Sequence, residues 1–135
     1  MIWLLFVLWY PGDDAIIVIT SKDTQLDVLQ LYQLRSLYLG KTDQIKGERL
    51  TPCQIKLPKE LRNQFEDLVF GPSFDVDLYW VNQGLKGGVK PPLTFHDQAI
   101  LMAIISRNPG FVGFVHVSQR EHLQSFRLKE IVIKD

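Results

Sequence analysis

The sequence predicts an α/β fold in which a mixed sheet is layered between helices, an α/β/α arrangement. Two observations lead to this prediction. Runs rich in β-branched and aromatic residues, such as 15–20 and 111–117, are typical of buried strands. Between such runs lie segments whose apolar residues recur at helical spacing. Because the two kinds of segment alternate along 135 residues, we expect one domain with helices on both faces of the sheet.

The chain opens with its most hydrophobic run, residues 2–10. This run is too short to span a bilayer, which takes roughly 20 residues as a helix, but it suits the core of an export signal. We therefore expect residues 1–14 to be an export signal or its remnant and residues 15–135 to form the domain. A periplasmic or other envelope location follows, with the cytoplasm as the alternative. No basic residue precedes Lys22, so a first strand or a short core helix is the other interpretation of the run.

Residues 15–20 are expected to form a strand covered on both faces. Leu31, Leu34 and Tyr38 then fall at i, i+3 and i+7, which predicts a helix that Gly40 ends. A turn at Gly47 leads to a strand at 50–57, with Pro52 near its start or at an edge of the sheet.

Pro58 is suited to the first turn of a second helix, whose buried face holds Leu61, Phe65, Leu68 and Val69. Gly71 is expected to end that helix. A third helix follows, for which Ser73 is the candidate N-cap and whose buried side is expected to hold Phe74, Leu78 and Val81. The glycine-rich stretch 84–92 then predicts a mobile loop.

The last helix is expected to start at Thr94, with Asp97 completing a capping box, and to be buried on most of its surface at 99–105. Asn108-Pro109-Gly110 ends it and turns the chain into the strand 111–117. Gly110 is expected to take a positive φ, and Gly113 to lie where another element approaches closely. A final strand is predicted within 126–133.

Composition excludes several functions. Lys+Arg and Asp+Glu are equal at 15 each, so the basic footprint of a nucleic-acid-binding protein is missing. Cys53 is the only cysteine, and the histidines show no ligand-like spacing, so we expect no metal site and no cofactor. His96 next to Asp97 lacks a nucleophile, and a helix cap explains the pair better than catalysis. We therefore expect a protein that is not an enzyme.

The order of the segments resembles that of the substrate-binding proteins of phosphate ABC transporters, in a short form of the type 2 periplasmic binding protein fold. The matching segments span about residues 15–117 and read IIVIT at 16–20, LYQLRSLYLGK at 31–41, IKLPKELRNQFEDLVFG at 55–71, YW at 79–80, Lys90-Pro91-Pro92 and NPGFVGFV at 108–115. The resemblance implies one lobe of a protein that clasps its anion between two lobes. It also implies a phosphate loop at 56–60, where the family's arginine and Ser-Gly-Thr-Ser run are missing.

Four residues are candidates for binding an anion. Lys56 and Lys59 flank the expected start of a helix, whose free N–H groups attract anions. Thr20 and Ser21 end a strand and could offer hydroxyls from a neighbouring strand end. We therefore expect weak binding of phosphate or another small oxyanion, for ABC-type uptake or sensing. The alternative is an envelope interaction module without a ligand, whose partner is an envelope or transporter protein.

Overall fold

The computed structural model describes residues 5–6 and 16–135. Its helices are α1 (Leu31–Tyr38), α2 (Lys59–Phe70), α3 (Val76–Lys86), α4 (Gln98–Ser106) and the 3-10 helix η1 (Val117–His122). Its strands are β1 (Leu5–Phe6), β2 (Ile16–Ser21), β3 (Val28–Gln30), β4 (Gln44–Ile45), β5 (Glu48–Arg49), β6 (Thr51–Ile55), β7 (Leu93–Phe95), β8 (Phe111–His116) and β9 (Leu128–Lys134).

The strands form one mixed sheet and one small hairpin. The order in the main sheet is β1-β9-β2-β8-β6-β7, with β3 also paired to β9, while β4 and β5 form the hairpin. β2 runs antiparallel to both of its neighbours, β8 and β9. β6 runs parallel to both β7 and β8. β2 therefore runs against the strands on either side of it, while β8, β6 and β7 form a parallel group beside it.

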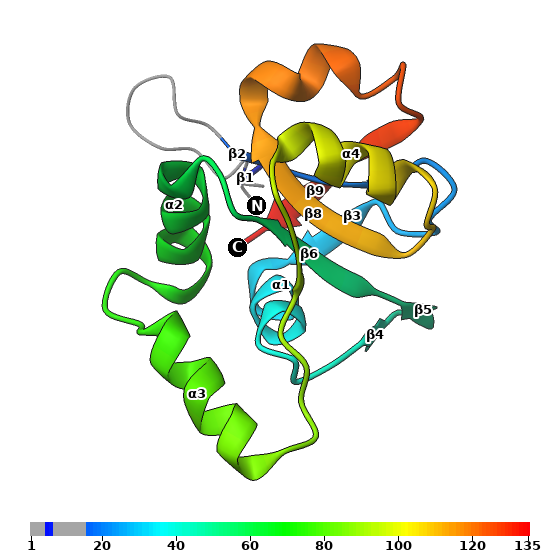
Figure 1. The fold of residues 1–135 in the computed structure, drawn as a ribbon. Helices are drawn as coiled ribbons and strands as arrows, with labels where there is room; N and C mark the ends of the chain where they lie inside the picture. The colour runs from blue at the N-terminus through cyan, green and yellow to red at the C-terminus, as the bar shows by residue number, and fades with distance from the viewer. Residues whose placement is uncertain (1–4, 7–15) are drawn as a thin grey trace.

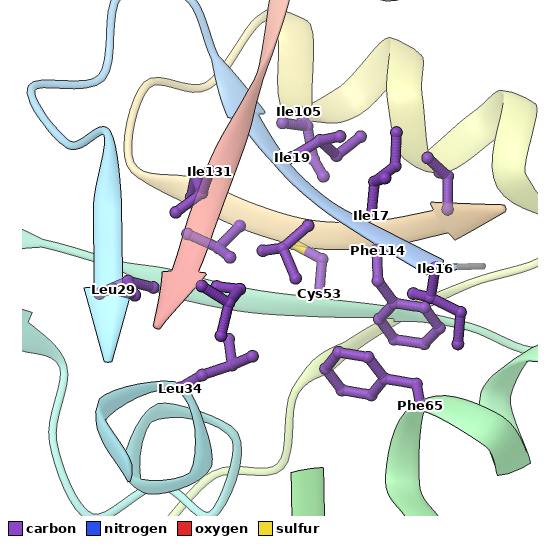
Figure 2. Close-up of a cluster of buried hydrophobic side chains, with 14 of the residues drawn as sticks. Ile16, Ile17, Ile19, Leu29, Leu34, Cys53, Phe65, Ile105, Phe114 and Ile131 are labelled. Carbon is purple, nitrogen blue, oxygen red and sulfur yellow. The ribbon is translucent and has the colours of Figure 1, made fainter. Parts of the chain in front are cut away.

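Helices cover both faces of the sheet, as predicted (Figure 1). Two neighbouring residues of β8 identify the helix on each face, because successive side chains of a strand point to opposite sides of the sheet. A Cβ atom on Gly113 would lie 2.6 Å from Ile105 Cδ1 of α4. The next residue, Phe114, instead stacks on Phe65 of α2, with ring centroids 3.8 Å apart (Figure 2). The close approach expected at Gly113 is therefore confirmed, and α4 is the element that approaches.

The layer between the sheet, α1 and α2 is an aromatic core. The Tyr38 ring meets that of Phe65 edge-on at 4.9 Å, and its hydroxyl donates to the Cys53 carbonyl at 2.7 Å. Burial raises the pKa of Tyr38 well above its usual value. Burial also raises the pKa of the Cys53 thiol to about 12. Cys53 is therefore a small apolar core residue rather than a reactive thiolate.

The predicted strands 15–20 and 111–117 are confirmed as β2 and β8, and the helices predicted before Gly40 and before Gly71 as α1 and α2. Gly40, Gly71 and Gly110 all have positive φ, and Gly110 reaches +92° in the predicted turn. The predicted cap at Thr94 is wrong, because Thr94 belongs to β7 and pairs with Gln54 of β6. Asp97 caps α4 instead, its Oδ1 accepting from Ile100 N at 3.0 Å. Nor is α4 buried nearly all round, since Ile100 is exposed.

The third helix was assigned the wrong cap and the wrong buried side. Asp75, not Ser73, caps α3, and its Oδ1 accepts from Leu78 N at 3.0 Å. α3 has no buried residue, and Phe74, Leu78 and Val81 are all exposed. The face that contacts the rest of the chain carries Tyr79, whose hydroxyl donates to Leu39 O at 2.6 Å.

Most of the predicted export signal lies outside the described residues. Of the hydrophobic run, the structure describes only Leu5 and Phe6, which pair with Lys134 and Ile133 of β9. A cleavage near Ala15 therefore stays a prediction. Within the described residues, no helix has the length and hydropathy needed to cross a membrane.

Candidate functional site

The candidate site lies where parallel strands end together and α2 begins. β6 and β7 run side by side to their carboxyl ends, and the pairing continues past them: Lys56 N donates to Phe95 O at 2.8 Å and Leu57 N to His96 O at 2.9 Å. In sheets of this kind, ligands bind beyond the carboxyl ends of the strands. Pro58 is the N-cap of α2 and its side chain makes no capping hydrogen bond. The positive end of the helix dipole is therefore left for an external acceptor.

A hollow of about 260 Å³ opens at this point. It is lined by Lys56, Leu57, Lys59, Arg62, Asn63, Glu66 and Asp77. The structure thus brings together both predicted lysines, as the sequence analysis expected. Three cations face two carboxylates there, so the hollow carries an excess of positive charge while the whole chain is neutral.

Arg62 was missed by the sequence analysis. Lys59, Arg62, Asn63 and Glu66 lie at i, i+3, i+4 and i+7, which is one face of a helix. That face lies beside the buried one formed by Leu61, Phe65 and Val69, about 110° away round the helix. The spacing of Lys59 and Arg62 could have revealed the arginine, because cations three apart on a helix share a surface.

Glu66 forms an ion pair with Arg62 and so offsets part of the positive charge that Arg62 brings to the hollow. Arg62 Nε lies 3.4 Å from Glu66 Oε2, and both side chains are largely covered. Burial raises the pKa of Glu66, and the Arg62 charge only partly opposes that rise, while Asp77 and Asp67 add to it. Glu66 therefore takes up a proton at a higher pH than an ordinary glutamate does.

Glu60, a carboxylate in the first turn of α2, does not line this hollow. It follows Lys59 directly and so points about 100° further round the helix. It lines a separate hollow together with Pro58, Leu61, Gln64, Gln98, His116 and Ser118. Its charge is therefore not in the hollow that holds the lysines.

Thr20 and Ser21 do not join the lysines. β2 runs opposite to β6, and Thr20 pairs with Val112, which pairs with Pro52. The carboxyl end of β2 is thus level with the start of β6, about 13 Å along the strand from Lys56. The prediction that these hydroxyls face the lysines from a neighbouring strand end is wrong, because it assumed parallel strands.

Both hydroxyls have structural partners instead. Thr20 Oγ1 donates to Phe111 O at 2.7 Å and lies 2.9 Å from Thr24 Oγ1. Thr24 Oγ1 in turn accepts from Gly110 N at 2.8 Å. Ser21 Oγ accepts from Asp23 N at 3.2 Å. The threonine bonds tie the turn before β8 to the loop after β2, and the serine bond lies within that loop.

The remaining polar candidates serve the fold. His96 Nδ1 lies 3.3 Å from Asp97 Oδ2, and the hydrogen bonds from Ile100 N and His96 lower the pKa of Asp97. The capping explanation of this pair is confirmed. Within residues 5–6 and 16–135, no group of three or more His, Cys, Asp or Glu is placed to hold a metal ion.

No protein-family model matches the sequence, and curated proteins give no significant match by sequence. Solved structures do match the fold. An ABC-type phosphate transport receptor from Vibrio cholerae superposes with a TM-score of 0.66 at 17% identity, and PstS from Borrelia burgdorferi with 0.69 at 11%. A putative phosphate ABC transporter substrate-binding protein with bound phosphate, from Clostridium perfringens, gives 0.65 at 13%.

These matches cover 89% of this chain but only 45–47% of the solved ones. The chain therefore spans less than half the length of the proteins it resembles. At such low identity the likeness establishes the fold, which is that of a single lobe of a phosphate-binding protein.

Proposed function

We propose that this domain binds a small oxyanion, with phosphate as the leading candidate, in the hollow lined by Lys56, Lys59 and Arg62. The observation that carries the proposal is the coincidence of these cations with the uncapped start of α2 at the carboxyl ends of β6 and β7. Positive side chains and a helix N-terminus at one place attract an anion. The binding-protein fold supports the same assignment, since its solved neighbours are phosphate transport proteins. Such binding would serve ABC-type uptake or sensing of the oxyanion.

The affinity of this half-site is expected to be low. Lys56 and Lys59 are exposed, so each charge acts through a high effective dielectric and contributes nearer 1 than 4 kcal/mol. A dissociation constant on the order of 1 mM, or about −4 kcal/mol, is the result. Binding is expected to weaken as salt rises, because charges at a surface are screened over about 10 Å at 0.1 M.

Replacing both Lys56 and Lys59 with alanine is expected to weaken phosphate binding at least tenfold, because two of the three cations in the hollow are lost. Calorimetric titration at low ionic strength measures the change. Lys22→Ala is the control, since this exposed lysine follows β2 at the opposite end of the sheet. Equal phosphate affinities for the double variant and the Lys22 variant would contradict the proposed site.

Anion binding is also expected to strengthen as pH falls through the raised pKa of Glu66. Above that pKa the carboxylate holds Arg62 and opposes the anion; below it the neutral acid does neither. At a pH above that pKa, Glu66→Gln should therefore bind more tightly than wild type, by roughly 2- to 10-fold for about one charge removed. Sulfate is the suitable probe, because its charge does not change over this pH range.

His96 needs a control of its own, because it lies beside Leu57, whose N donates to His96 O. In the His96→Gln background, sulfate affinity should still rise as pH falls through the raised pKa of Glu66. Adding Glu66→Gln to that background should flatten the profile. A rise that persists in the double variant would show that Glu66 does not regulate the hollow.

A further inference from the structure

The exposed face of α3 carries three large apolar side chains that the anion site does not use. Leu78, Val81 and Leu85 are 54%, 61% and 83% exposed. They fall at i, i+3 and i+7, so they form a single stripe about 10 Å long on the helix. Figure 1 shows α3 at the lower left, outside the layers formed by the sheet and the other helices.

The opposite face of α3 already has its partners within the chain. Tyr79 donates to Leu39 O at 2.6 Å, and its ring meets that of Trp80 edge-on at 5.0 Å. Trp80 lies so close to Gly40 that a Cβ atom there would be 3.2 Å from its ring. α3 is therefore fixed by its aromatic side and presents its aliphatic side to solvent. A leucine that is 83% exposed on an ordered helix makes no contribution to this domain's own core.

Charge is divided between the two ends of α3. At its start, Glu66, Asp67, Asp75 and Asp77 line one hollow with Phe74. At its end, Lys86 lies in the last turn, and beyond the end lies a second hollow that includes Lys41 and Lys90. The helix dipole, positive at the start and negative at the end, offsets only part of these full side-chain charges.

We propose that α3 is a self-association surface, on which a second copy of this chain packs its own α3 in antiparallel orientation. A two-fold axis between Val81 and Asn82 places Leu78 opposite the partner's Leu85. The same axis brings the acidic start of each α3 near Lys86 at the end of the other. The apolar stripe of each copy thus covers that of the other, and the acidic end of each α3 meets the basic end of the other. Such a contact is isologous and closes at two copies.

One helix buries little area, so the dimer is expected to be weak. In sedimentation equilibrium of the full chain, the mean mass should rise from 15.6 kDa toward twice that value between about 10 µM and about 500 µM. Leu85→Glu should hold the protein at the monomer mass. Tyr32→Glu, at a position on α1 that is 63% exposed, should leave the association unchanged. A mass that stays at 15.6 kDa over this range overturns the proposal, as does association that Leu85→Glu does not reduce.

A charge reversal tests the antiparallel orientation. Lys86→Glu should weaken association severalfold, because the acidic start of one copy then meets an acidic residue at the end of the other. Association that Lys86→Glu leaves unchanged overturns the antiparallel arrangement.

Mixed cysteine variants give an independent readout of the register. Leu78→Cys and Leu85→Cys proteins should form a disulfide with each other when mixed, while each alone forms little. Cys53 does not interfere, because it is fully buried. Equal crosslinking in the separate samples overturns the proposed register.

Discussion

Gly110→Val is expected to lower the free energy of unfolding by about 2–5 kcal/mol, combining backbone strain with overpacking. Gly110 has a φ of +92°, which a β-branched residue adopts only at a cost. A Cβ atom there would also lie 2.6 Å from the Arg49 carbonyl oxygen, a backbone atom that cannot move aside freely. The turn is held on both sides, since Gly110 N donates to Thr24 Oγ1 at 2.8 Å and Thr51 N donates to Gly110 O at 2.9 Å.

Gly88→Val is the matched control for this change. Gly88 has nearly the same φ, +88°, but nothing lies within 4 Å of the position of its Cβ atom. The two variants share the backbone strain and differ in the collision with Arg49. Urea denaturation should therefore find Gly110→Val less stable than Gly88→Val by about 1–3 kcal/mol. Equal midpoints would contradict the role given to the Asn108–Gly110 turn.

Phe65→Ala is expected to destabilise the domain by about 3–5 kcal/mol, the usual range for a buried phenylalanine. Phe65 is fully buried and stacks on Phe114 with ring planes only 6° apart. Its loss also removes the edge contact with Tyr38. The cavity would lie between α2 and the sheet, where it would loosen the helix that carries Lys59 and Arg62.

Phe126→Ala is the control, because Phe126 is partly exposed on the loop before β9. Its cost should stay below about 1 kcal/mol. Thermal and urea unfolding of both variants measure the difference. A small effect at Phe65 would mean that α2 is not anchored through its aromatic core.

The sequence was sufficient for elements whose apolar pattern fits only one kind of secondary structure. The apolar runs 16–20 and 111–116 are too short for helices and so predict strands. Leu61, Phe65 and Val69 have helical spacing and mark one face of α2. It failed where two local signals compete. Thr94 and Asp97 have the spacing of a capping box, but pairing with β6 takes Thr94 into a strand and leaves Asp97 as the cap. Both sides of α3 are apolar, so the pattern could not say which one packs.

The site was predicted in part for a related reason. Lys56 and Lys59 are close in sequence and flank one strand–helix junction, so local reasoning was enough to place them together. Thr20 and Ser21 depended on the direction of β2, which is set by long-range pairing with β8 and β9. No local pattern carries that information. Glu66 and Asp77 entered the hollow through the packing of α2 beside the start of α3.

The most direct test of the anion site is an amide NMR titration of the full chain with phosphate at low salt. Phosphate should shift the amide signals of residues 56–62 with a dissociation constant on the order of 1 mM. The amide chemical shifts of residues 20–24, at the other end of the sheet, should not change. Absence of shifts at 56–62, or equal shifts at both ends of the sheet, would contradict an oxyanion site at the start of α2.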